Sequence, residues 1–182
     1  VLYVIPQLTV GGAERMLCQM VTGFNRSKVE PVVWNLGNPG KFSYPIRKAG
    51  VTLIERAPLG RSKYLYLDAL KFISFVYRGR FDIVHSFMFG PHWVDAVLAK
   101  LASDVQYVVA RLEVQLWRRG NTRLGWGERM RNCLVTHSIA NSQAVKRVIT
   151  EIEGYTEDRV SVIYNGVDLE TVSYTHLTLP TN

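Results

Sequence analysis

Two adjacent glycines, Gly11 and Gly12, stand where an apolar run meets a helical pattern, in the stretch VLYVIPQLTVGGAERMLCQMV. The first backbone N–H groups of a helix have no partner inside it, and the helix dipole places a positive partial charge there. Glycine lets a ligand approach the backbone closely. The pair predicts contact with an anionic group such as a phosphate, with a plain tight turn as the alternative. Glu14, in the first turn, is predicted to complement the dipole.

Two more side chains with useful chemistry follow apolar runs. His85, in DIVHSF, is predicted to close a buried strand and to face a crevice, where it would hydrogen-bond a sugar hydroxyl or orient a reacting group. A core histidine with its hydrogen bonds satisfied is the alternative. Arg111 closes the run VQYVVAR and suits bidentate binding of a phosphate or carboxylate. Its alternative is a salt bridge with the nearby Glu113.

Loops after the last two apolar runs supply further polar residues. Asn141 or Ser142 is predicted to cap the helix that follows SIAN. Asn165 and Gly166 predict a turn after VSVIY. The sequence shows no metal-ligand spacing, no nucleophile–base triad and no P-loop.

The elements that must position these residues alternate along the chain. Apolar runs that predict strands cover residues 1–5, 29–36, 51–55, 82–87, 105–111, 138–141 and 160–164. Helical patterns cover residues 12–25, 45–49, 63–77, a stretch that begins at Pro91, residues 126–137, and a stretch after Ser142. We expect Gly79 to end the third helix as a glycine just past its last turn, and we expect His92 and His137 in helices. Strands that alternate with helices predict an α/β fold with a doubly wound, Rossmann-like parallel sheet, whose ligands bind beyond the carboxyl ends of its strands.

Composition limits the remaining possibilities. A chain of 182 residues, 47% hydrophobic and 20% charged, fits one soluble globular domain or one domain plus a fragment. The net charge of +7 is concentrated in an arginine-rich stretch over residues 111–131, without the signature of a nucleic-acid-binding module. A solvated basic face is the alternative to an anionic partner. Cys18 and Cys133 lie in helical patterns and are expected to be reduced core residues of a cytoplasmic protein.

The last residues depart from this pattern. TVSYTHLTLPTN carries no charged side chain and shows neither a helical period nor a capped strand. From Val172 to Thr181 it resembles the translation of an adapter used in sequencing libraries. We therefore expect residues 172–182 to be a non-native tail, with a genuine hairpin or tail as the alternative.

The motifs together resemble the N-terminal half of a GT-B glycosyltransferase, most closely family 4. The four motifs that carry the resemblance are Gly-Gly-Ala-Glu-Arg (11–15), Asp-Ile-Val-His (82–85), Ala-Asn-Ser (140–142) and Asn-Gly-Val-Asp (165–168). They occur in the family's order, and the resemblance spans residues 1–171. The resemblance implies transfer of a sugar from a nucleotide-sugar donor to a glycan, a lipid-linked or a small-molecule acceptor, retaining the anomeric configuration, with no metal or other cofactor.

The resemblance also implies roles for individual residues. Gly11 and Gly12 would lie at the cleft near the donor diphosphate, His85 would face the transferred sugar, and Arg111 with Glu113 would line the acceptor side. The family's donor-domain signature, two glutamates separated by seven residues, is absent, so the C-terminal donor-binding domain is expected to be missing and the fragment to be inactive alone.

Alternatives to sugar transfer stay open at this point. They are a GT-B-fold sugar-nucleotide epimerase and a non-enzymatic α/β ligand-binding module. Localisation is expected to be cytoplasmic, with contact at the inner face of the membrane through helix 63–77 and the arginines as an option. Burial of that helix against the sheet is the favoured alternative to membrane contact. Nucleic acid is not expected as a partner.

Overall fold

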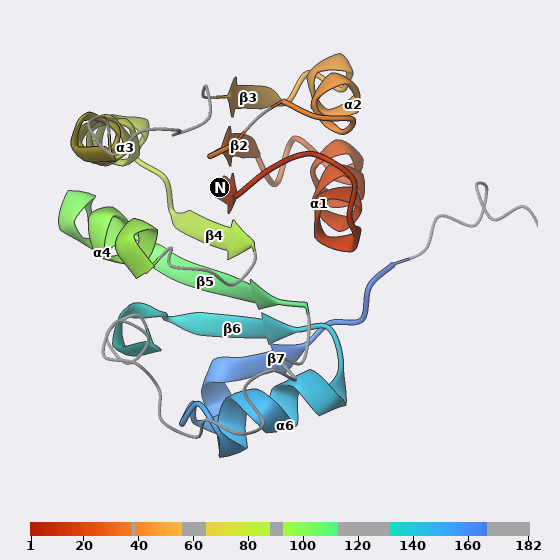
Figure 1. Cartoon of the computed structure of the whole chain (residues 1–182), viewed down its shortest axis with the longest axis vertical. Helices are drawn as coiled ribbons and strands as arrows, with labels where there is room; N and C mark the ends of the chain where they lie inside the picture. Colours follow the sequence, from red (N-terminus) through yellow and green to blue (C-terminus); the bar gives the residue numbers. More distant parts are fainter. Residues whose placement is uncertain (38, 56–64, 88–92, 113–131, 167–182) are drawn as a thin grey trace, which may run out of the picture.

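The structure is a computed structural model that describes residues 1–37, 39–55, 65–87, 93–112 and 132–166. Its centre is a sheet of seven parallel strands in the order β3-β2-β1-β4-β5-β6-β7 (Figure 1). The strands are β1 (Leu2–Ile5), β2 (Val32–Asn35), β3 (Thr52–Glu55), β4 (Ile83–Phe87), β5 (Gln106–Arg111), β6 (His137–Ala140) and β7 (Val160–Val162). The predicted α/β fold with a doubly wound parallel sheet is confirmed.

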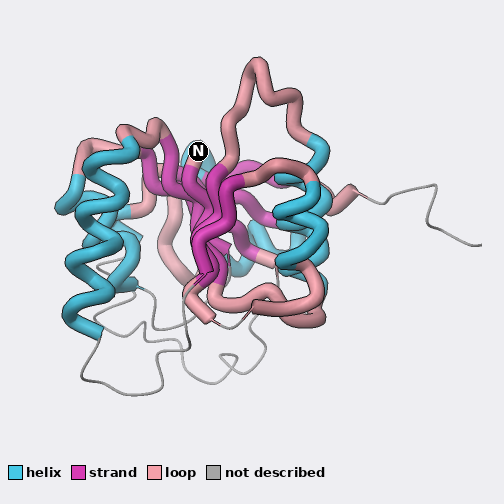
Figure 2. Tube along the Cα trace, turned by 90° about the horizontal axis from the view of Figure 1, so that it is seen from above, coloured by secondary structure: helices cyan, strands magenta, loops and turns pink. Residues whose placement is uncertain are grey.

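Helices cover both faces of the sheet (Figures 1 and 2). They are α1 (Gly12–Gly23), α2 (Ser43–Lys48), α3 (Leu65–Gly79), α4 (Trp93–Ala102) and α6 (Gln143–Glu151), with a short 3-10 turn at Glu157–Arg159. α1 and α2 lie on one face, and α3 and α4 lie on the other. Right-handed crossovers require this arrangement, because the chain moves from β1 towards β3 and then crosses back to β4 and on towards β7.

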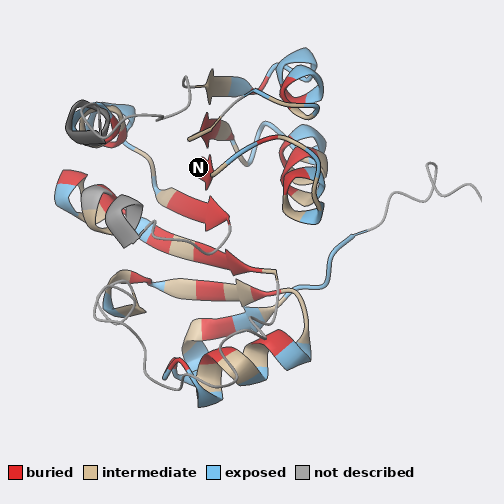
Figure 3. Ribbon diagram, viewed as in Figure 1, coloured by how far each residue is buried: buried red, intermediate tan, exposed pale blue. Residues whose placement is uncertain are grey.

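Two buried cores follow from the alternation of side chains along the strands. On the face of α1 and α2, Tyr3 and Ile5 of β1 pack with Leu17 and Val21 of α1. The core on the opposite face is built from side chains of both strands and helices, among them Val4, Phe72, Val76, Ala99, Val145 and Ile149. Burial follows the strands through the middle of the molecule (Figure 3). Runs buried on both faces are typical of parallel sheets, which explains why the central strand β1 is apolar and buried throughout.

Some local predictions were wrong. His137 lies in β6, where it pairs with Val108 of β5, and not in a helix. Burial alternates along this strand as it does in a sheet: Ser138 and Ala140 are buried, whereas His137 is half-buried. Cys133 is exposed rather than part of the core, whereas Cys18 is buried, and both are free thiols.

The end of α3 differs as well. Gly79 is the last residue of the helix, and the positive φ of 44° belongs to Arg80. A Cβ at Gly79 would stand 2.8 Å from the Cζ of the Phe81 ring, so a larger residue there would displace that ring. The predicted helix start at Pro91 and His92 lies outside the described residues.

Candidate functional site

The topology fixes where a ligand is expected. The chain proceeds from β1 to β2 and β3 on one side of the sheet, and continues from β4 on the other side of β1. In open α/β sheets, ligands bind in the crevice at the carboxyl ends of the two strands where the winding reverses. Here those strands are β1 and β4, so the loop that ends at Gly11, together with Gly12 at the start of α1, borders the crevice.

Gly11 makes room for a neighbouring carboxylate. It is the N-cap of α1, with an extended φ of −176° that any residue adopts, and its carbonyl accepts a hydrogen bond from Arg15 N at 3.2 Å. Glu14 folds back over it, so that a Cβ at Gly11 would overlap the carboxylate and stand 2.9 Å from Glu14 Cδ. Glu14 is only 3% exposed, and Gln7 Nε2 donates a hydrogen bond to its Oε1 at 3.4 Å. The carboxylate thus lies at the positive end of the helix dipole, where it is stabilised.

Gly12 differs from its neighbour. It is exposed, its φ is not in the left-handed region, and a Cβ added to it would have no described atom within 4 Å. Neither backbone strain nor packing of the described residues requires glycine at this position. Contact with a donor phosphate stays a prediction for both glycines, but the open surface lies at Gly12 and not at Gly11.

The loop between β2 and α2 supports the loop between β1 and α1. A Cβ at Gly40 would overlap the carbonyl of Leu8 and stand 2.7 Å from Thr9 N, and a Cβ at Gly37 would overlap the carbonyl of Pro6. Phe42 N donates to the Leu8 carbonyl at 3.2 Å. The two glycines therefore let the loop between β2 and α2 rest on the backbone that leads to Gly11. Sequence reasoning missed this support; the only signal was the turn-rich stretch around Gly37 and Gly40.

His85 lies inside the sheet rather than at a strand end. It is the third residue of β4, pairs with Tyr3 of β1 and Val108 of β5, and is 8% exposed. Its ring centroid lies 5.4 Å from that of Tyr3 and 4.9 Å from that of Phe87. Burial lowers the pKa of His85 to about 4, so the imidazole is neutral at physiological pH.

One nitrogen of this ring is unusual. Nε2 of His85 is buried and has no hydrogen-bond partner among the residues that the structure describes. Its catalytic role stays a prediction. A neutral imidazole in this place would serve as a hydrogen-bonding group and not as a charged one.

Arg111 has a partner that the sequence did not indicate. At the carboxyl end of β5, its Nη2 pairs with Glu153 Oε2, and both side chains are buried. Glu113, the expected partner, lies outside the described residues. Asn141 is brought to the same strand end, because its Nδ2 donates to the Leu112 carbonyl at 2.6 Å and its backbone N donates to the Arg111 carbonyl at 3.1 Å. The acceptor-side role of Arg111 stays a prediction.

The remaining predicted residues lie at other places. Ser142 caps α6, since its Oγ accepts from Val145 N at 3.3 Å. Asn165 and Gly166 border a groove of about 510 Å³ formed with α1, which contributes Met16 and Met20.

The described residues provide neither a metal site nor a membrane-spanning helix. Within the described ranges, no three His, Cys, Asp or Glu side chains gather closely enough to hold a metal ion. A search of the same ranges finds no helix with the length and apolar character that crossing a bilayer requires.

A reversal of winding at β1 and β4, with a glycine-bearing loop at the crevice, defines a Rossmann-like α/β domain. Residues 10–171 match the sequence profile of Glycosyltransferase Family 4. The chain belongs to this family. Comparison with curated proteins gives no significant match.

Solved structures with the same fold include HepE from Anabaena and a glycosyltransferase from Rickettsia africae. HepE from Anabaena, in complex with UDP, matches with a TM-score of 0.69 and 18% identity, over 93% of this chain and 44% of its own. A glycosyltransferase from Rickettsia africae matches with a TM-score of 0.65 and 17% identity, over 92% of this chain and 43% of its own. The chain therefore spans less than half the length of these proteins.

An epimerase shares the fold at lower similarity. The UDP-N-acetylglucosamine 2-epimerase from Rickettsia bellii matches with a TM-score of 0.59 and 13% identity, over 90% of this chain and 44% of its own. At such identities the likeness concerns the fold alone.

Proposed function

We propose that this chain is the acceptor-side half of a retaining, metal-independent glycosyltransferase that moves a hexose from a nucleotide sugar to an acceptor. The observation that carries the proposal is the family match over residues 10–171, on a fold whose winding reverses at the loop of Gly11 and Gly12. Its structural relative HepE is described in complex with UDP and with UDP-glucose, which supports a nucleotide sugar as the donor. The donor-binding half belongs to polypeptide beyond these residues.

In this proposal Gly12 admits the donor diphosphate to the first turn of α1. Its exposed position supports that role, as does the free space around it, where a Cβ would meet no described atom within 4 Å. Backbone N–H groups and the dipole stabilise negative charge there, and the charge on the leaving diphosphate grows as the sugar bond breaks. Gly11 contributes indirectly, because it lets the Glu14 carboxylate fold into the protein.

His85 is proposed to contact the transferred sugar as a neutral hydrogen-bonding group. Its buried Nε2, which lacks a described partner, supports this role, and its lowered pKa excludes an imidazolium at neutral pH. Arg111 and Asn141 are proposed to shape the acceptor side by holding the end of β5. Free thiols and a nucleotide-sugar donor favour a cytoplasmic location.

The experiment compares this chain with the same chain joined to its natural second half. Alone, the chain should show no micromolar binding to UDP-, GDP- or ADP-sugars by calorimetry. Joined to its second half, it should release the nucleoside diphosphate only when an acceptor is present, and mass spectrometry should find the acceptor heavier by one hexose. Micromolar binding by the isolated chain would favour a self-contained binding module instead.

The epimerase is the second candidate, because the Rickettsia bellii enzyme shares the fold. It predicts a changed sugar configuration without any acceptor. Formation of a 2-epimer in the absence of acceptor would replace the transferase proposal. The family match favours transfer, and so does the glycosyltransferase from Rickettsia africae, whose TM-score of 0.65 is higher than the 0.59 of the epimerase.

A further inference from the structure

At the amino ends of the strands the molecule carries a surface that sugar transfer does not explain. Tyr77 and Arg78 lie in the last turn of α3, Arg80 follows that helix, and Lys100 and Leu101 lie in the last turn of the neighbouring α4. We call these five residues the α3–α4 end surface. It lies at the opposite edge of the sheet from Gly12, because each helix of this fold runs from the carboxyl edge of the strands back to their amino edge.

Two large apolar side chains of this surface are exposed. Tyr77 is 68% exposed and Leu101 is 72% exposed, whereas Phe72, Val76 and Ala99 of the same helices are buried in the core. Leu70, one heptad before Tyr77 on the same side of α3, is 49% exposed. Burial against the sheet therefore accounts for one face of these helices and leaves apolar groups on the other.

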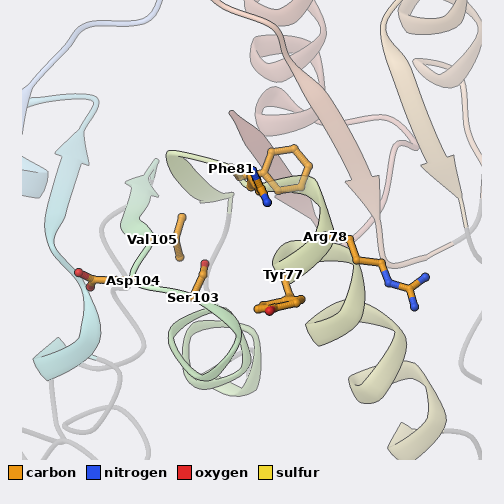
Figure 4. A pocket seen from close by; sticks show the side chains of 7 residues that line it. Tyr77, Arg78, Phe81, Ser103, Asp104 and Val105 are labelled. Atoms are coloured by element: carbon orange, nitrogen blue, oxygen red, sulfur yellow. The ribbon is translucent and has the colours of Figure 1, made fainter.

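A pocket between the helix ends brings the polar groups together. Its volume is about 610 Å³, and its lining includes Tyr77, Arg78, Arg80, Ser103 and Asp104. In Figure 4 the side chains of Tyr77 and Ser103 lie in the space between the two helix ends, and Arg78 extends away from Asp104. Ser103 Oγ is buried and has no hydrogen-bond partner among the described residues.

The charge of the surface is positive. Neither Arg78 nor Arg80 forms an ion pair with any residue that the structure describes. Among the described residues that line the pocket, Asp104 is the only acid, and its Oδ1 lies 4.0 Å from Lys100 Nζ. Arg80 holds a positive φ of 44°, which a glycine would adopt without strain, so folding does not call for an arginine there.

We propose that the α3–α4 end surface binds the headgroup region of an anionic lipid bilayer. Exposed leucine and tyrosine side chains beside two arginines suit the interface of a bilayer, where negatively charged headgroups lie directly above the apolar interior. Arg78 and Arg80 bind phosphate groups of the lipid headgroups, and Tyr77 with Leu101 enters the boundary beneath them. The surface is independent of the proposed sugar transfer, and the test can fail without affecting it.

The test measures co-sedimentation of the full chain with two kinds of vesicle. One contains phosphatidylcholine alone, and the other also contains phosphatidylglycerol. The chain should bind only the anionic vesicles, and added salt should weaken binding. Arg78→Gln combined with Arg80→Gln should lower the partition coefficient roughly 30-fold, from about 1 kcal/mol for each basic residue. Leu101→Ser should also lower it.

The matched control removes the same charge elsewhere. Lys28 and Arg147 are exposed and lie outside the α3–α4 end surface. Lys28→Gln combined with Arg147→Gln should change binding less than about threefold, because the surface potential of a membrane decays within a Debye length. Circular dichroism and melting temperature must show that all variants fold.

Three outcomes would overturn the proposal. The first is an absence of binding to anionic vesicles by the folded chain. The second is an equal loss in the test and control pairs, which would indicate diffuse attraction without a defined surface. The third is a dimer in light scattering that Leu101→Ser dissolves, which would assign the apolar groups to a second copy of the chain.

Discussion

Gly11 and Glu14 should be energetically coupled. A Cβ at Gly11 would overlap the Glu14 carboxylate and approach its Cδ to 2.9 Å, about 1 Å inside ordinary contact distance. Gly11→Ala therefore forces the buried Glu14 side chain from its rotamer, at a cost of about 1 kcal/mol. The extended φ of −176° adds no backbone strain, and alanine lowers the entropy of the unfolded chain, which stabilises by about 0.4–1 kcal/mol.

The double-mutant cycle separates these contributions. In a Glu14→Ala background the overlap is absent, so Gly11→Ala should be neutral or stabilising. In the wild-type background the overlap should offset that gain. The difference, a coupling free energy of about 1 kcal/mol, corresponds to about 2–4 °C in melting temperature for a chain of this size. Urea unfolding followed by circular dichroism measures all four proteins.

Glu14→Gln is the matched control for this cycle. It keeps the shape of the side chain, so Gly11→Ala should be as unfavourable in the Glu14→Gln background as in the wild-type protein. A coupling free energy below about 0.3 kcal/mol between Gly11→Ala and Glu14→Ala would refute the explanation that Gly11 exists to accommodate Glu14. In that case a bound ligand, and not Glu14, would explain why residue 11 is glycine.

Two further predictions concern buried charge. Arg111→Met should destabilise the fold by about 3–5 kcal/mol in urea unfolding, because it leaves Glu153 buried without its partner, and Arg111→Met with Glu153→Leu should recover most of the loss. A double variant that is no more stable than Arg111→Met alone would contradict a purely structural role for the pair. Since the pKa of His85 falls from 6.5 to about 4 on folding, the unfolded chain binds a proton more readily, and His85 should cost roughly 3 kcal/mol of stability as the pH falls from about 6.5 to about 4. His85→Phe should remove that part of the pH dependence. If the stabilities of the wild-type protein and the variant change with pH in the same way, the buried neutral imidazole is contradicted.

Much of the fold could be predicted because it depends on local patterns. Apolar runs alternate with helical periods, and the right-handed crossover rule then leaves few topologies. The glycine-bearing loop was placed correctly at the start of α1 for the same reason. Ser142 was recognised as one of two possible caps, since the signal for a cap is local in sequence.

What could not be predicted depends on distant contacts. Arg111 is 42 residues away from Glu153, and the nearby Glu113 was the natural partner to expect. His85 was placed at a strand end, but the apolar run continues into Phe87, which the sheet also pairs. The different roles of Gly11 and Gly12 depend on the direction of one Glu14 side chain, and the sequence does not indicate that direction.

The most direct test of the proposed function compares two glycines of α1 in the chain joined to its donor-binding half. Gly12 and Gly23 stand at opposite ends of the helix and are both exposed, and a Cβ added to either would have no described atom within 4 Å. Gly12→Val and Gly23→Val should therefore have similar, small effects on folding. Only Gly12→Val should lower the rate of sugar transfer, by roughly 100-fold, because its side chain blocks the approach of the diphosphate to the backbone. A folded Gly12→Val enzyme that transfers sugar as fast as the Gly23→Val enzyme would contradict the proposed donor site.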